Sequence, residues 1–78
     1  SSAASDVYKR QPHETLSNRE YQVFEMIAVG KKIIEIANEL HLSSKTISTY
    51  RSRIINKMKL SSNTELTKYA IANKLISM

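Results

Sequence analysis

The chain contains no cysteine and no tryptophan, and it has only one glycine and one proline among its 78 residues. Without cysteine, neither a disulfide framework nor a thiolate metal site can form. The scarcity of glycine, proline and aromatic residues favours helices over strands and tight turns. No apolar run approaches the roughly 20 residues that a membrane span requires, and no secretory signal is recognisable. We therefore expect one small all-α domain in the cytoplasm, with no membrane association.

Side-chain patterns that carry catalysis are missing as well. His13, in the leader region, and His41 are far apart in the sequence, and no Ser/His/acid set, metal-ligand spacing or glycine-rich phosphate loop is present. We therefore expect no enzyme, no metal and no cofactor. His41 is expected to be a solvent-facing turn residue.

The full chain has a net charge of +5, and its positive charge is concentrated in the second half. Residues 12–44 carry three basic and five acidic side chains, whereas residues 45–78 carry seven basic side chains and one acidic one. Such asymmetry indicates a polyanionic partner for one face, with nucleic acid as a candidate. The alternative is a solvated basic surface that has no partner.

The first eleven residues, SSAASDVYKRQ, have no helical period and no apolar face. The codons of DVYKRQ could match a transposon end that is used in sequencing adapters. We therefore expect residues 1–11 to be a read-through artefact, a scar or a disordered leader, and we assign the folded domain to residues 12–78. On this hypothesis the native chain continues upstream, where a partner domain would precede this one.

Capping signals and apolar periods predict four helices. SNRE at residues 17–20 is a capping box that opens the first helix, and Gly30 can end it in a left-handed conformation. The second helix reads KIIEIANEL and lacks a good cap at Lys32. A short turn, HLS, leads to Ser43, which is the natural cap of a third helix that runs to about Lys59.

A second capping box, SNTE at residues 62–65, opens the fourth helix. The second and third helices are joined by a tight turn, and the third is basic. This arrangement predicts a helix-turn-helix with the third helix as the recognition helix.

The third helix has an apolar face, formed by Ile47, Tyr50, Ile54 and Met58, and an opposite polar face. In a major groove, its basic flanks would reach phosphates while short hydroxyl side chains approach the base edges. Its free N-terminal amides would suit a phosphate. The lysines that begin the second helix either point into water or meet a phosphate. The predicted base-reading residues are Lys45, Ser48, Thr49 and Ser52, and the predicted phosphate-binding residues are Lys32, Ser43, Thr46, Arg51, Arg53 and Lys57.

Residues 16–75 resemble the LuxR-type helix-turn-helix, also called the NarL/FixJ output domain. The joint order and spacing of the landmarks carry this resemblance, rather than any one of them. The landmarks are Leu16, Arg19-Glu20, Val23, Gly30, Ile36-Ala37, Leu40, Leu42-Ser43, Lys45-Thr46-Ile47, Lys57-Met58, Glu65-Leu66 and Ala70. The sequence departs from the family at Tyr50, where histidine is usual, and at His41 and Lys59-Leu60, where glycine is often found.

The resemblance implies a four-helix domain that binds double-stranded promoter DNA as a homodimer, with residues 45–53 as the recognition helix. It implies base contacts at Ser48, Thr49 and Ser52 and phosphate contacts at Thr46 and Lys57. It further implies the C-terminal output domain of a two-component response regulator, with RNA polymerase as another candidate partner. The dimer surface is implied on the fourth helix, at Thr64, Thr67, Lys68 and Ile71.

Two rival interpretations remain open from the sequence. One is region 4 of a sigma factor, which is also a basic helix-turn-helix; the LuxR-like landmarks of the first and fourth helices favour the output domain instead. The other is a protein-interaction module that binds an acidic partner through the same basic face. Salt-dependent binding to random duplex DNA would distinguish the DNA-binding interpretations from the protein-binding one.

Overall fold

A computed structural model of the chain describes residues 12–76; the expected artefact or leader at residues 1–11 lies outside them. A short 3₁₀ helix, η1 (Pro12–Thr15), precedes four α-helices, and no strand occurs in this part of the chain. The α-helices are α2 (Asn18–Ala28), α3 (Ile33–Leu40), α4 (Ser44–Met58) and α5 (Asn63–Ala72). The prediction of an all-α, four-helix fold is confirmed.

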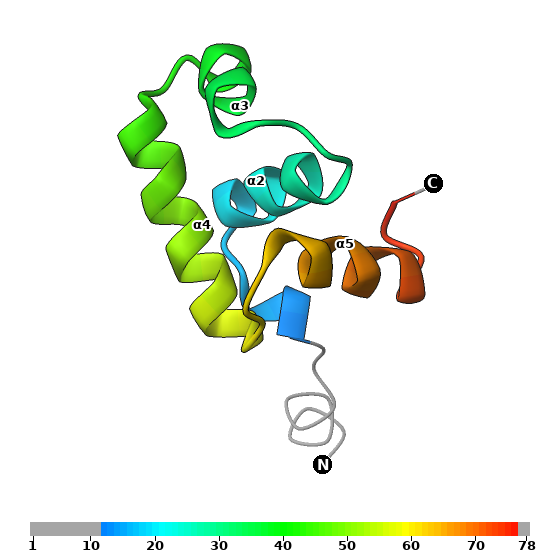
Figure 1. Ribbon diagram of the computed structural model, residues 1–78. Helices are drawn as coiled ribbons and strands as arrows, with labels where there is room; N and C mark the ends of the chain where they lie inside the picture. The colour runs from blue at the N-terminus through cyan, green and yellow to red at the C-terminus, as the bar shows by residue number, and fades with distance from the viewer. Residues whose placement is uncertain (1–11, 77–78) are drawn as a thin grey trace.

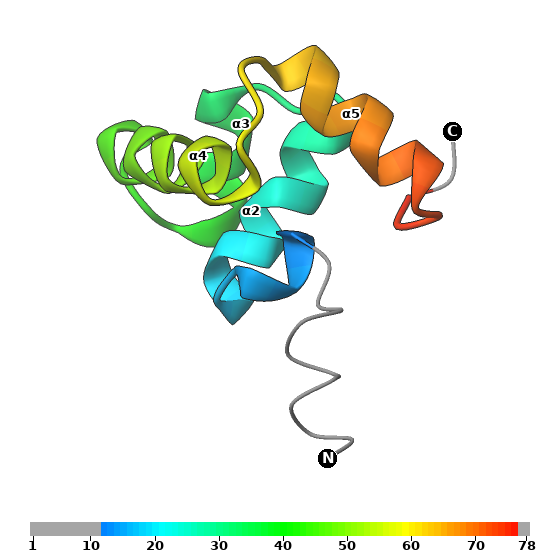
Figure 2. The same cartoon turned by 90° about the horizontal axis from the view of Figure 1, so that it is seen from below.

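The helix α2 lies at the centre of the domain and packs against both α4 and α5 (Figure 1). The helix α3 packs on α4, so the two form the predicted helix-turn-helix pair. Seen from below, α4 occupies one side of the domain while α5 leads away to the other (Figure 2). One face of the long helix α4 therefore packs against α2 and α3, and the opposite face is exposed to solvent.

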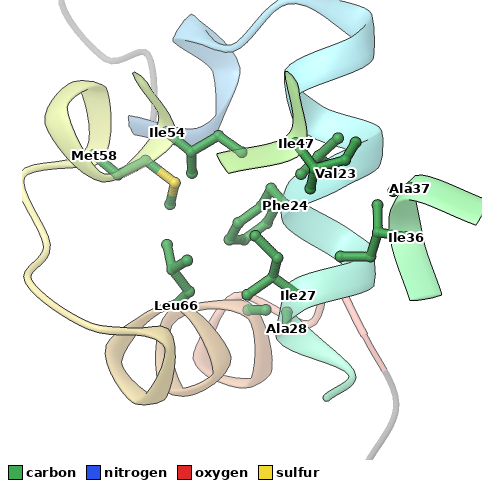
Figure 3. Packing of buried hydrophobic residues seen from close by; sticks show 11 residues of the cluster. Val23, Phe24, Ile27, Ala28, Ile36, Ala37, Ile47, Ile54, Met58 and Leu66 are labelled. Carbon is green, nitrogen blue, oxygen red and sulfur yellow. The ribbon is translucent and has the colours of Figure 1, made fainter. Parts of the chain in front are cut away.

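The core is built from the apolar faces that the helical periods predict. Phe24 is fully buried and lies in the middle of the cluster, with α4 on one side and α5 on the other (Figure 3). The predicted inward face of α4 is confirmed, although Tyr50 is only half-buried. The buried apolar residues are Val23, Phe24, Ile27, Ala28, Ile36, Ala37, Ile47, Ile54, Met58, Leu66 and Ala70.

The predicted capping box of α2 is present. The hydroxyl of Ser17 accepts a hydrogen bond from the Glu20 amide at 3.2 Å, and Glu20 Oε1 accepts one from the Ser17 amide at 2.8 Å. At α3 the side chain of Lys32 makes no capping hydrogen bond, as expected. However, the Lys32 amide donates to Glu35 Oε1 at 2.8 Å, so the helix start has one half of a capping box.

The capping box predicted at SNTE, residues 62–65, is formed with a different partner, Ser61 in place of Ser62. Ser62 caps α5 by accepting from the Glu65 amide at 3.2 Å. The Glu65 carboxylate, instead of returning to the Ser62 amide, accepts from the amide and the hydroxyl of Ser61, at 2.5 and 2.6 Å. Ser61 offers two donors to one carboxylate oxygen, and they hold the pKa of the Glu65 carboxyl below its usual value.

All four α-helices end in the same backbone pattern, in which one amide donates to the carbonyl three positions earlier and the next amide donates to the carbonyl five positions before itself. The pattern requires a left-handed residue, which is Gly30 (φ 99°) after α2, as predicted. After α3, α4 and α5 that residue is His41 (φ 58°), Lys59 (φ 56°) and Lys74 (φ 57°), where glycine would be the less strained choice. A partly buried leucine follows each of these three residues and packs against the core.

Candidate nucleic-acid interface

The open side of α4 carries all four residues predicted to read bases. Lys45, Ser48, Thr49 and Ser52 are exposed, whereas Ile47 and Ile54 on the other side of the helix are fully buried. Hydroxyl groups occupy the centre of this face, so a flat surface can approach the helix backbone closely. A helix that enters a major groove presents a face of this kind.

The start of α4 is capped as the sequence predicts. Ser43 Oγ accepts a hydrogen bond from the Thr46 amide at 3.1 Å, and the two side-chain oxygens lie 2.9 Å apart. Ser43 is exposed and Thr46 is half-buried. Because the amides of a first helical turn lack acceptors within the helix, this end of α4 suits a negatively charged group.

The basic side chains around α4 differ in how far they are already engaged. Arg53 is exposed, and its side chain makes no polar contact with another residue in 12–76. Arg51 Nε donates to Asn63 Oδ1 at 2.6 Å, which orients its guanidinium from the start of α5 and leaves the two terminal nitrogens unused. Arg53 and Arg51 can therefore both reach an external anion.

The two lysines before α3 are distinguished by their contacts. Lys31 Nζ lies 2.7 Å from both carboxylate oxygens of Glu39, so its charge is compensated within the domain. Lys32 is exposed and its side chain has no such partner among the described residues. Of this pair, Lys32 is therefore the lysine whose charge is not compensated within the described residues, and its contact with a phosphate stays a prediction.

Lys57 pairs with the carboxylate of Glu20, for which the sequence predicts only a capping box. Its Nζ donates to Glu20 Oε1 at 2.7 Å, and the Glu20 side chain is only 4% exposed, whereas that of Lys57 is 42% exposed. Burial by itself raises the pKa of the Glu20 carboxyl, but the hydrogen bonds and charge of Lys57 and the Ser17 donors outweigh it, and the pKa is lowered. Lys57 is thus a tether between α4 and α2 as well as a candidate phosphate ligand.

The predicted dimer residues do not all lie in the same environment. Thr64, Lys68 and Ile71 form an exposed stripe on α5, and Ile71 is 46% exposed. Thr67 is half-buried and its hydroxyl lies 3.0 Å from the Ala28 carbonyl and 3.2 Å from the Asn63 carbonyl. Thr67 therefore ties α5 to the end of α2, and only the other three predicted residues lie on the outward face of α5.

One contact between the start and the end of the domain is not predicted from the sequence. His13, expected in the leader region, lies in η1, and its Nδ1 is 2.9 Å from the Tyr69 hydroxyl of α5. Tyr21 and Phe24 continue this aromatic cluster, with ring centroids 5.7 Å apart. His13 and Tyr69 are 56 positions apart, so no local pattern could reveal their hydrogen bond.

His41 lies in the turn between α3 and α4 and is exposed, as predicted.

Residues 12–76 contain no pocket, and no three acidic, histidine or cysteine side chains in this range are grouped so that they could hold a metal ion. None of the described helices is long and apolar enough to cross a membrane. The polar face of α4 is therefore the candidate functional surface of the described residues.

Comparison with known proteins identifies the family. The model of the luxR family of bacterial regulatory proteins (GerE) matches residues 14–70. The chain is 42% identical over 64 residues to the response regulator UvrY of Escherichia coli, and 38% identical over 66 residues to the transcriptional regulatory protein LiaR of Bacillus subtilis. It is 36% identical over 73 residues to the oxygen regulatory protein NreC of Staphylococcus haemolyticus.

These alignments cover 82%, 85% and 94% of this chain but only 29%, 31% and 34% of the respective relatives. The chain thus spans about a third of the length of the proteins that it matches. The family match also decides between the two DNA-binding interpretations, in favour of the LuxR type over sigma region 4. The chain belongs to the LuxR family of bacterial regulatory proteins, and its fold is the helix-turn-helix DNA-binding domain of that family.

Proposed function

We propose that this domain binds promoter DNA sequence-specifically by laying α4 in the major groove of a duplex, and that it thereby regulates transcription. The observation that carries the proposal is the exposed face of α4, which has hydroxyl groups at its centre and basic side chains at its edges. This division suits a groove, because phosphates border it on both sides and base edges form its floor. No catalytic role and no cofactor form part of the proposal.

The contacts fall into two classes. Base edges would be read by Lys45, Ser48, Thr49 and Ser52. Phosphates would be held by Arg51 and Arg53 on the flanks, by Ser43 and Thr46 at the start of α4, and by Lys32 at the start of α3. Lys57 would contribute a weaker phosphate contact, because its charge is already partly compensated by Glu20.

The longer protein to which the domain would belong is a two-component response regulator in the cytoplasm. UvrY is named a response regulator and LiaR a transcriptional regulatory protein, and both are about three times as long as the matched segment. A receiver domain upstream of residue 12 would then supply the regulatory input.

A homodimer on DNA is proposed through α5. The exposed stripe of Thr64, Lys68 and Ile71 faces away from the core and includes one of the three exposed large apolar side chains of the described residues. Because a twofold dimer uses the same patch on both copies, such a stripe can pair with itself. RNA polymerase is a further candidate partner of the bound dimer.

A random-site selection on duplex DNA, followed by salt titration, tests the proposal. The expected result is one enriched sequence, with half-sites at a fixed spacing if a dimer binds, and an affinity that falls with salt. Non-specific duplexes should bind with Kd of about 10⁻⁴ to 10⁻⁶ M at physiological salt. The absence of any salt-dependent duplex binding would refute the proposal and favour the protein-interaction module.

A further inference from the structure

The hydroxyl of Thr49, on the exposed face of α4, already donates its proton inside the helix. Its Oγ1 lies 3.1 Å from the carbonyl oxygen of Lys45, one turn earlier. A carbonyl oxygen can only accept, so the shared proton belongs to Thr49 and points toward the backbone. Toward a partner, Thr49 therefore presents only the lone pairs of Oγ1 and a methyl group.

The neighbouring serines differ from Thr49 in this respect. Ser48 and Ser52 share the exposed face, but their hydroxyls make no hydrogen bond to another residue in the described range 12–76. A serine without an internal acceptor can turn either its proton or its lone pairs toward a base. Among the three hydroxyls of this face, Thr49 alone has its donor engaged.

The polar groups on the major-groove edges of the bases are either hydrogen-bond donors or hydrogen-bond acceptors. Adenine N6 and cytosine N4 are donors, whereas guanine O6 and N7 and thymine O4 are acceptors. An oxygen that can only accept forms a hydrogen bond with the amino groups and repels the carbonyl oxygens. To satisfy guanine or thymine, Thr49 would have to turn its proton outward and lose the hydrogen bond to Lys45.

We propose that Thr49 is a specificity-determining residue that selects a base with an exocyclic amino group, adenine or cytosine, at one position of the operator. The inference rests on the proposed function, since it requires α4 to lie in the major groove. The discrimination is that of one net hydrogen bond, which corresponds to about three- to tenfold in affinity. Ser48 and Ser52, whose donors are unengaged, should discriminate less between amino and carbonyl edges.

Two variants separate the oxygen of Thr49 from its methyl group. Thr49→Val keeps the branched shape and loses the oxygen, whereas Thr49→Ser keeps the hydroxyl and loses the methyl group. Random-site selection is carried out with the wild-type chain and both variants, after circular dichroism and thermal unfolding have verified that all three are folded. We expect one operator position to lose its adenine or cytosine preference in Thr49→Val and to keep it in Thr49→Ser.

A second measurement removes the amino group from the DNA instead. At the position that responds, adenine is replaced by purine or cytosine by 2-pyrimidinone, both of which lack the exocyclic amino group. The wild-type chain should lose about three- to tenfold in affinity, while Thr49→Val should lose nothing further. Such non-additivity would assign the contact to the Thr49 oxygen and the base amino group.

The failures of the inference and of the proposed function are distinguishable. A guanine or thymine preference at the responding position, or a preference that Thr49→Val retains in full, would overturn the role of Thr49 while leaving DNA binding intact. A wild-type chain that binds no duplex in a salt-dependent manner would overturn both.

Discussion

Glu20 at the start of α2 and Lys57 near the end of α4 form an ion pair, in which Lys57 Nζ lies 2.7 Å from Glu20 Oε1. The same oxygen also accepts a hydrogen bond from the Ser17 amide. The N-terminal cap of the central helix and the position of the proposed recognition helix thus depend on the same carboxylate. Since the Glu20 side chain is buried and Lys57 is partly exposed, the pair lies at the boundary between the core and the proposed DNA surface. Substitutions of Lys57 should therefore affect both stability and DNA binding.

Replacing Lys57 with methionine should lower the free energy of unfolding by about 1–3 kcal/mol, because a buried carboxylate loses its charged donor. Methionine retains most of the apolar stem, so the loss reports the ammonium group. Denaturant unfolding at pH 7 measures it. Glu20→Gln on the Lys57→Met background is the matched control, because it removes the unpaired charge and should restore part of the stability. Equal stability of Lys57→Met and the wild-type chain would show that the pair contributes nothing.

Acid should destabilise the domain through Glu20. The folded-state pKa of this carboxyl is lowered from the model-compound value of 4.5, so the folded state holds the charged form more tightly than the unfolded chain does. The stability that this provides is fully present above about pH 5 and is lost as the pH falls through the lowered pKa. Unfolding curves from pH 7 to pH 3 should show the loss in the wild-type chain and a smaller loss in Glu20→Gln. An identical acid response in both chains would contradict the assignment to Glu20.

Arg53→Ala should weaken binding to all duplexes by a similar factor and should reduce the slope of log Kobs against log salt concentration by about 0.9, as expected for one lost phosphate contact. Arg53 has no internal partner among residues 12–76, so stability should stay within about 0.5 kcal/mol of wild type. Lys31→Ala is the matched control, because the charge of Lys31 is compensated by Glu39 and its removal should leave the slope nearly unchanged. A sequence-selective loss in Arg53→Ala would instead assign it to base reading.

Lys59→Gly should stabilise the domain by about 1 kcal/mol, because Lys59 has a left-handed backbone that is strained for a residue with a Cβ atom. Thermal and denaturant unfolding measure the gain. Gly30→Ala tests the same conformation in the opposite direction and should be destabilising, although no atom lies within 4 Å of the added Cβ. A destabilised Lys59→Gly would mean that the lysine side chain contributes more than its backbone strain costs.

The helices could be predicted from the sequence because short local patterns determine where they begin. Ser17, Ser43 and Ser62 each accept a hydrogen bond from an amide three residues later, and such spacing is visible in the sequence alone. The polar and apolar faces of α4 follow from its period for the same reason. Contacts between residues far apart, such as His13 with Tyr69 and Lys57 with Glu20, lie outside the reach of these patterns.

The helix ends that lack glycine were harder to predict from the sequence than the helix starts. His41 and Lys59 stand where glycine was expected, and each is followed by a leucine that packs against the core. The apolar contact of that leucine is a regular part of this helix stop, and the pairs His41-Leu42, Lys59-Leu60 and Lys74-Leu75 repeat it. The leucine that follows therefore marks the end of each of these helices in the sequence, whereas the left-handed residue before it does not.

The repeated helix stop bears on how fast the domain can fold. Each α-helix begins on a cap and ends on backbone hydrogen bonds that join residues no more than five positions apart. The limits of each helix are therefore fixed by contacts between residues that are close in the sequence, and little loop entropy is lost in forming them. Domains dominated by local contacts fold in microseconds to milliseconds. Because helices of 8 to 15 residues are marginal in isolation, packing around Phe24 stabilises all four helices, while the caps and stops determine where each one begins and ends.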